Sequence, residues 1–352
     1  MSIKKLVGNR YLKSGLGLLI GGVSFYLAVR GVAFSEFKSA IENANLPFVG
    51  LALLSTAIIV VGRVFRWKLL LGSAGYGISH KKSLMALLAG QALNLIYPAR
   101  VGDLSRAYLL DETGQGRVYI LGTVVLEKLF DSITYVLIFF LLFSLLPLPT
   151  WLSSSGYTFA TLTFISVTII VSLAYRVEWV FKSFQSLTAR FPQFFKGRFV
   201  TWLQSGLESL AILRNKRDLA KLLILSLVIW IIPIFTNHFT LLALQIKLPL
   251  TASILTMLVL QASVAIPSIP GRIGVFEYLC VLSLSLFGIS ESPAFTYGVL
   301  LHVIALLPST ILGLIFLWVL GFYRNKGMLK AMPVSEAGDL RIQNSADIDN
   351  AS

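Results

Sequence analysis

Hydrophobic runs long enough to cross a lipid bilayer recur along the whole chain. A helix that spans the hydrocarbon core needs ~20 mostly apolar residues. Six segments meet this requirement, namely 14–33, 47–71, 118–146, 157–175, 220–246 and 295–322. The pattern therefore predicts an all-α polytopic membrane protein with about six full transmembrane helices.

Two further apolar stretches, 83–110 and 250–288, are interrupted by proline and glycine. Each contains Pro-x-Arg-aliphatic-Gly followed by an acidic residue, at Pro98–Asp103 and at Pro270–Glu277. Such breaks are tolerated within a membrane only where protein or a water-filled cavity satisfies the freed backbone groups. We therefore predict a re-entrant helical hairpin at each stretch, with helix breakers at Pro98, Gly102, Pro267, Pro270, Gly271 and Gly274.

The distribution of Lys and Arg predicts how the chain is oriented. Cytoplasmic loops of membrane proteins carry an excess of basic residues. The N-terminal residues, the end of the second span and segment 176–221 are basic, whereas 147–156 has no charged residue and 289–294 has only Glu291. Both termini are then cytoplasmic, and the two hairpins enter from opposite faces. Segments 47–146 and 220–322 would form inverted-topology repeats, with eight to ten membrane segments in all.

The chain is expected to form one transmembrane domain over 1–330. Within it, segment 176–219 is basic and rich in Phe and Trp, a composition typical of helices that lie in the cytoplasmic interface of an anionic membrane. Residues 331–352 are polar and without periodicity, and we expect a disordered cytoplasmic tail.

Composition supports the membrane assignment and removes several other classes. Hydrophobic residues make up 56% and charged residues 13% of the chain, and the mean hydropathy is +0.80, whereas soluble domains have roughly 25% charged residues. The basic residues that give the formal charge of +14 lie between apolar runs, so we expect no nucleic-acid partner. Cys280 is the single cysteine, which excludes an intrachain disulfide, and the three histidines are scattered. We predict neither a metal site nor a cofactor.

Charged residues within the apolar stretches are the candidates for function, because a charge at membrane depth is costly. The guanidinium group pairs with phosphate oxygens through two parallel hydrogen bonds, which points to an anionic headgroup. For Arg63 and Arg66, simple snorkelling at the end of a span is the alternative interpretation. The predicted headgroup-binding residues are Arg63, Arg66, Asn94, Arg100, Arg106 and Arg272.

Acidic residues accompany these cations. Glu127 and Asp131 are four residues apart and share a helix face, so they either pair with the arginines of the first hairpin or couple transport to protons. A tight extracellular turn is the alternative for the Pro270 motif. The predicted gating or charge-compensating residues are Asp103, Glu127, Lys128, Asp131 and Glu277.

Four blocks of sequence together resemble one known family. They are Arg63-x-x-Arg66-Trp-Lys, Asn94-x-x-x-Pro-x-Arg-x-Gly-Asp-x-x-Arg106, Glu127-Lys128-x-x-Asp131 and Pro267-x-x-Pro-Gly-x-x-Gly-x-x-Glu277. In this order and spacing the chain resembles the lysylphosphatidylglycerol synthase transmembrane-domain family, also described as flippase-like membrane proteins. Asp103 and Lys128 stand where that family usually has Glu and Arg, and both keep the charge.

The resemblance implies translocation of a lipid between leaflets. No catalytic motif and no soluble aminoacyl-transferase domain are found in the 352 residues, so we expect a stand-alone member that is not an enzyme. The expected partners are plasma (inner) membrane lipids, either an anionic phospholipid or an isoprenoid-linked glycolipid. A homo-oligomer and a separate lipid-modifying enzyme stay open as partners. A membrane-embedded enzyme of lipid modification and a small-solute or ion transporter are the alternative functions.

Overall fold

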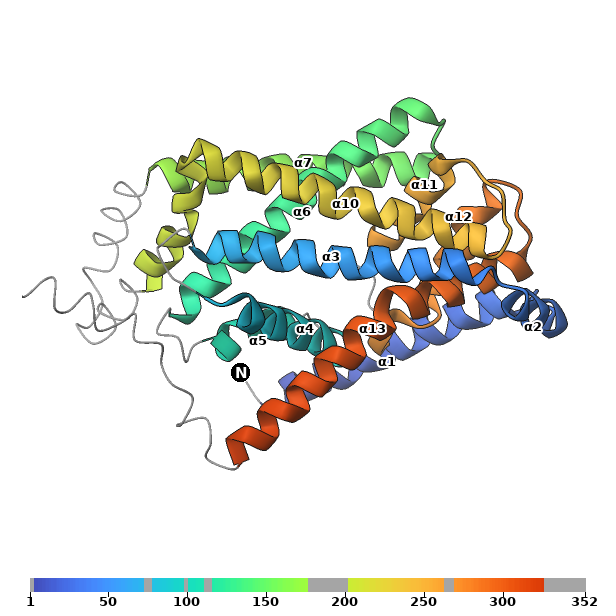
Figure 1. Cartoon of the computed structure of the whole chain (residues 1–352), viewed down its shortest axis with the longest axis horizontal. Coiled ribbons are helices and arrows are strands. Elements are labelled where there is room, and N and C mark those ends of the chain that lie inside the picture. The colour runs from blue at the N-terminus through green and yellow to red at the C-terminus, as the bar shows by residue number, and fades with distance from the viewer. Residues whose placement is uncertain are drawn as a thin grey trace, which may run out of the picture. The chain divides into compact units, whose positions relative to one another are not determined.

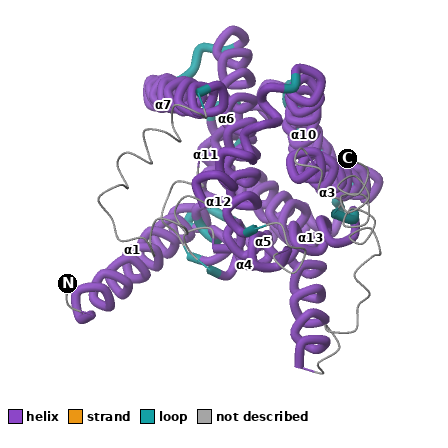
Figure 2. Tube along the Cα trace, turned by 90° about the vertical axis from the view of Figure 1, so that its left-hand side faces the viewer, coloured by secondary structure: helices purple, strands orange, loops and turns teal. Residues whose placement is uncertain are grey.

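A computed structural model describes residues 3–72, 78–97, 101–110, 116–176, 202–262 and 269–325. Throughout these residues the regular elements are helical (Figure 2), which confirms the predicted all-α polytopic fold. Within them, five helices are long and apolar enough to cross a membrane, and a bent pair of helices would make a sixth span. The chain divides into two compact units, residues 1–313 and 314–352. In the comparisons below, the last helix is considered only up to Gly313, within the first unit.

Five of the six long helices among the described residues are these candidate spans, and the first makes a sixth span only together with the short helix that follows it. The six are α1 (Ile3–Val29), α3 (Leu46–Gly72), α6 (Arg117–Leu145), α7 (Thr150–Tyr175), α10 (Lys216–Ala243) and α13 (Glu291–Asn325), the last of which crosses from the first unit into the second. The shorter elements are α2 (Phe34–Glu42), α4 (His80–Ile96), α5 (Val101–Leu110), η3 (Ser209–Arg214), α11 (Leu250–Ala262), η5 (Pro270–Arg272) and α12 (Val275–Ser285).

The two interrupted stretches each fold as a pair of short helices. The longest of the four, α4, has 17 residues, which corresponds to about 26 Å at a rise of 1.5 Å per residue. None of the four reaches the ~30 Å of a bilayer core. In Figure 1, α4–α5 and α11–α12 approach the middle from opposite ends of the bundle. Their tips meet, because a Cβ on Gly271 would lie 3.6 Å from Leu95 Cδ1.

The order of elements repeats with the direction reversed. Helices α3, α4, α5 and α6 are followed later in the chain by α10, α11, α12 and α13, and each element runs opposite to its counterpart (Figure 1). The first members of the two sets pack side by side. Ser55 Oγ and Thr236 Oγ1 are 2.7 Å apart, and Gly62 lets α3 approach Ile229 closely. This is the arrangement expected of inverted-topology repeats.

One element, α2, has no counterpart among the segments predicted from hydropathy. It follows α1 after a bend of 82°. Its apolar residues Phe34, Phe37 and Ile41 recur at helical spacing with mostly polar residues between them, so one face of the helix can pack against the protein while the other faces solvent. The ring of Phe37 lies 6.0 Å from that of Phe295 on α13. A stretch of nine residues is too short to register as a span.

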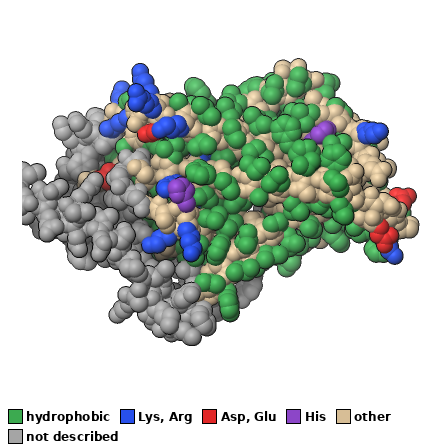
Figure 3. Space-filling view, viewed as in Figure 1, with side chains coloured by type: hydrophobic (Ala, Val, Ile, Leu, Met, Phe, Trp, Pro, Cys, Tyr) green, Lys and Arg blue, Asp and Glu red, His purple; other side chains and the backbone are tan. Residues whose placement is uncertain are grey.

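Exposed side chains separate into an apolar middle and charged ends. In Figure 3 hydrophobic side chains cover the centre of the visible face, and blue basic side chains gather at one end. Basic residues are exposed where α4 and α10 begin, at Lys81, Lys82, Lys216, Arg217 and Lys221. An apolar band between charged ends suits a multi-pass membrane protein.

Candidate functional site

Helices α3, α5 and α6 bring seven charged side chains together, and we call this group the charge cluster. Its centre is Arg66, which is fully buried. Arg66 Nη1 donates hydrogen bonds to Asp131 Oδ1 at 2.7 Å and to Ser226 Oγ of α10 at 3.1 Å. Its Nη2 lies 3.6 Å from Glu127 Oε1. The cluster consists of Arg63, Arg66, Asp103, Arg106, Glu127, Lys128 and Asp131.

Glu127 connects the cations of two helices. It lies one turn before Asp131 on α6, so both carboxylates face the same neighbours. Arg106 Nη1 of α5 donates to Glu127 Oε2 at 2.9 Å, while Arg66 approaches the other oxygen. The guanidinium of Arg106 also lies over the ring of Trp67 at 5.3 Å. A carboxylate between two arginines is well compensated in a medium of low dielectric.

Asp103 fastens the first hairpin at the start of α5. Asn94 Nδ2 on α4 donates to Asp103 Oδ1 at 3.0 Å, and the backbone N–H of Asp103 donates to Asn94 Oδ1 at 3.2 Å. Arg106 Nη2 and Lys128 Nζ lie 3.4 and 3.5 Å from the same carboxylate. A negative charge in the first turn also suits the dipole of α5. The cluster therefore holds α4 and α5 together and ties both to α6.

The cluster has more positive than negative charge. Among its described members, four cationic side chains face three carboxylates, which leaves one positive charge uncompensated. Arg66 Nε and Arg106 Nε are buried without a hydrogen-bond partner. Arg63 interacts electrostatically with Asp131 and Glu127, yet it forms no hydrogen bond or ion pair with the described residues. Buried donors of this kind are suited to an additional anion.

The second hairpin has a strained tip. Gly271 and Gly274 have φ values of 76° and 86°, and Arg272 between them has φ 59°. For an L-residue other than glycine this conformation costs about 1–2 kcal/mol. Arg272 Nη1 lies 3.4 Å from Leu260 O at the end of α11. At Gly274 a Cβ would meet Gly21 O of α1 at 2.4 Å, so only glycine fits there.

Glu277 and His302 complete this tip. Glu277 Oε2 accepts the backbone N–H of Gly274 at 2.7 Å and so caps α12. Its other oxygen contacts Nδ1 of His302 on α13, and His302 Nε2 lies 2.9 Å from Gly271 O. A side chain from α13 thus holds the turn at Gly271 that precedes α12.

The structure divides the predicted site residues into two groups. Asn94 joins the charge cluster through Asp103, with Gly102 packed against Gly90 of α4. Pro270, Gly271, Arg272, Gly274 and Glu277 lie at the tip of the second hairpin. Pro98, Arg100 and Pro267 lie outside the described residues.

Three residues that the sequence did not single out take part in these contacts. Ser226 binds Arg66, Trp230 Nε1 donates to Asp131 Oδ1 at 2.9 Å, and His302 binds Glu277. Ser226 and Trp230 are four residues apart in an apolar helix, and this spacing of polar groups was the available signal. Among the described residues no group of three His, Cys, Asp or Glu side chains could hold a metal ion.

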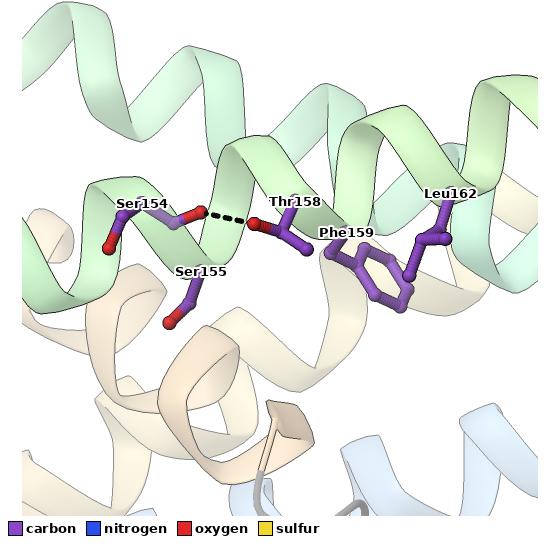
Figure 4. Close-up of a pocket in the computed structure, with 5 residues that line it drawn as sticks. All are labelled: Ser154, Ser155, Thr158, Phe159 and Leu162. Atoms are coloured by element: carbon purple, nitrogen blue, oxygen red, sulfur yellow. Dashed lines mark hydrogen bonds between the residues drawn. The ribbon is translucent and has the colours of Figure 1, made fainter.

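A shallow surface pocket on α7 does not add to the site. It is lined by Ser154, Ser155, Thr158, Phe159 and Leu162 (Figure 4). Thr158 Oγ1 donates to Ser154 O at 2.9 Å within the helix, and the Phe159 ring packs against Tyr135 of α6 at 4.9 Å. None of the lining residues belongs to the charge cluster. The cluster is therefore the better candidate.

Comparison with known proteins identifies relatives over most of the chain. The family described as "Lysylphosphatidylglycerol synthase TM region" matches residues 15–313, which include the charge cluster and both hairpins. Two UPF0104 membrane proteins of Methanocaldococcus jannaschii are also similar. One is 24% identical over 319 residues, which cover 86% of this chain and 94% of the relative. The other is 26% identical over 236 residues, which cover 64% of this chain and 93% of the relative.

Proposed function

The chain belongs to the lysylphosphatidylglycerol synthase transmembrane-region family, and from this membership and the charge cluster we propose that it is a lipid translocase. It moves a phosphate-bearing lipid between the leaflets of the plasma membrane. The uncompensated positive charge of the cluster is the observation that carries this proposal. A phosphate group supplies the missing negative charge and accepts hydrogen bonds from several guanidinium groups at once.

Arg63 is the side chain best suited to meet the phosphate first. Arg66 and Arg106 are engaged by carboxylates and are 0% and 3% exposed. Arg63 is partly exposed and shares their electrostatic surroundings, and it forms no ion pair within the part of the chain that the structure describes. Binding of a phosphate at Arg63 then leaves the existing ion pairs of Arg66 and Arg106 in place.

The buried state of Arg66 and Arg106 means that the headgroup needs an opening between helices. The first hairpin is the element suited to move, because α5 has only 10 residues and is held by polar contacts of Asn94, Asp103 and Arg106. A phosphate that competes for Arg106 weakens the contact with Glu127. The ligand itself then loosens α5 from α6.

Reconstitution in liposomes tests the proposal directly. Fluorescent phosphatidylglycerol, an isoprenoid-linked phosphate lipid and phosphate-free diacylglycerol are placed in both leaflets, and a membrane-impermeant quencher reports the exchange. We expect protein-dependent exchange of at least one phosphate-bearing lipid. Diacylglycerol crosses membranes unaided, so only a protein-dependent increase is scored. Absence of such an increase for every phosphate lipid, or formation of a modified lipid instead, would overturn the proposal.

Substitution of Arg63 gives a matched test within one helix. Arg63→Gln removes a charge without breaking an ion pair among the described residues, so we expect normal insertion. Exchange should fall at least tenfold, because a hydrogen bond to a charged group contributes about 1.5–3 kcal/mol. Lys68→Gln is the control, since it removes the same charge from α3, and His80 is the hydrogen-bond partner of Lys68 among the described residues. Equal exchange by both variants would place the phosphate contact elsewhere.

A further inference from the structure

His302 is held between two groups of the second hairpin. Its ring nitrogens contact Glu277 Oε1 and Gly271 O, and its ring stacks on Phe276 with centroids 4.3 Å apart. Glu277 is buried, and the His302 side chain is 12% exposed. The imidazole therefore joins α13 to both sides of the turn that precedes α12.

The contacts of His302 require one proton more than a neutral imidazole beside a carboxylate would hold. A backbone carbonyl only accepts, so His302 Nε2 carries a hydrogen toward Gly271 O. Glu277 Oε2 already accepts from Gly274 N. The contact between Nδ1 and Oε1 needs a hydrogen of its own, either on the imidazole or on the carboxyl group. In both cases the pair holds one proton more than a neutral imidazole beside a carboxylate.

Loss of that proton breaks the contact at the tip. Nδ1 and Oε1 would then face each other as two acceptors, and a change of tautomer would instead leave Gly271 O without its donor. Either outcome frees a turn that contains three residues with positive φ, at Gly271, Arg272 and Gly274. Since the His302 side chain is 12% exposed, loss of the proton to water would release the strained turn.

We propose that Glu277 and His302 form a proton-binding site that latches the second hairpin to α13. Deprotonation of the pair opens the hairpin, and protonation closes it. The role of this latch in lipid movement rests on the proposed function. The surroundings supply few competing charges. Among the described residues, the titratable groups found near the pair are Arg272 of η5, Cys280 of α12 and Tyr297 of α13. The neighbouring contacts from α1, α4 and α11 come from Gly21, Phe25, Leu95 and the Leu260 carbonyl.

Hydrogen–deuterium exchange of the full-length protein tests the latch without any transport assay. Exchange of segment 269–277 is measured from about pH 5.5 to 8.5, which brackets histidine titration, and is divided by the intrinsic rate. The loop 286–290 in the same protein is the internal reference. We expect the corrected exchange of 269–277 to rise about tenfold with pH, because the local opening becomes easier, while the reference stays flat.

Three variants decide whether this pair is responsible. His302→Gln and Glu277→Gln cannot hold the shared proton, so the rise with pH should disappear in each. His238→Gln should keep it, because His238 contacts the neutral hydroxyl of Ser253 on α11. A flat response of the wild-type protein, or an undiminished rise in both pair variants, would overturn the proposal. If one pair variant does not fold, the other gives the same decision.

The role in lipid movement is tested separately in liposomes that carry a proton gradient. Exchange by the wild-type protein should change at least threefold when the gradient is collapsed by a protonophore, and His302→Gln should not respond. The deuterium measurement needs no lipid movement. Absence of lipid exchange combined with a pH-dependent hairpin would therefore overturn the proposed function and uphold the proton site.

Discussion

Glu127 is the residue on which the charge cluster depends most, because two buried arginines approach its two oxygens. Glu127→Gln leaves Arg66 and Arg106 facing each other without the charge between them. Removing one partner of a buried ion pair costs about 3–5 kcal/mol, so we expect a large drop in the thermal unfolding temperature in detergent. The double variant Glu127→Gln/Arg106→Gln removes one charge of each sign and should be more stable than Glu127→Gln alone.

The exposed ion pair of Lys221 and Asp218 is the control for this double-mutant cycle. Lys221 pairs with Asp218 at 3.0 Å on the exposed surface, where ion pairs contribute about 0–1 kcal/mol. Neutralising Asp218 and Lys221, singly or together, should change the unfolding temperature little. If the effects of Glu127→Gln and Arg106→Gln simply add, the two side chains do not compensate each other.

At this scale the sequence predicts a residue's helix face better than its partners. The spacing of Glu127 and Asp131 predicts that both lie on one face of a helix, as they do on α6. That Trp230 would bind Asp131 could not be predicted, because 99 residues separate them and only packing brings α10 against α6. The contact of His302 with Glu277, 25 residues away, could not be predicted for the same reason.

The first hairpin depends on close contact between the backbones of its two helices. A Cβ on Gly102 would lie 1.8 Å from Gly90 O, a distance that rigid backbone cannot accommodate. Gly102→Ala should therefore separate α5 from α4. The variant should no longer elute as a single monodisperse peak in size-exclusion chromatography. Gly50→Ala in α3 is the matched control, because nothing lies within 4 Å of its Cβ and alanine favours helix by roughly 1 kcal/mol. Equal behaviour of the two variants would contradict the close packing.

Proline and glycine in the sequence predict where helices break. The ends of some long helices, however, differ by several residues from those expected from hydropathy. Expected spans 47–71 and 118–146 agree closely with α3 and α6, since continuous apolar sequence defines their ends. The span expected at 157–175 begins earlier, at Thr150, directly after Pro149. Serines and threonines in its first turns lowered the hydropathy, but in a helix their hydroxyls bond to carbonyls four residues back, as Thr158 does. Polarity alone therefore understates how far a membrane helix extends.

For the whole molecule, the distribution of basic residues leads to a definite prediction of topology. Exposed basic residues mark the starts of α4 and α10, and such residues favour the cytoplasmic side. In a Cys280→Ala background, cysteines at Lys81, Ser186 and Ser335 should be protected from an impermeant thiol reagent in intact cells. A cysteine at Glu36 on α2 should react. External labelling at Ser186 or Ser335 would contradict the proposed cytoplasmic location of both termini and the linker.

The contact between the two hairpin tips leads to a prediction about how the two repeats move during lipid exchange. Leu95 of α4 contacts the turn at Gly271, so the tips that enter from opposite ends share one contact. If the hairpins open alternately, fixing this contact should stop lipid exchange. Leu95→Cys and Gly271→Cys are combined in the Cys280→Ala background and joined with a short thiol crosslinker that reduction cleaves. We expect exchange to fall at least tenfold after crosslinking and to recover after reduction.

Single-cysteine variants separate this effect from strain at the turn. Gly271→Cys places a side chain at φ 76° and should lower stability by about 1–2 kcal/mol, with or without the reagent. Only the double variant should lose exchange reversibly. Undiminished exchange with the tips joined would show that neither hairpin needs to leave the other. The lipid would then have to pass along a surface that does not run between them, and the alternating-hairpin interpretation of the inverted repeat would be wrong.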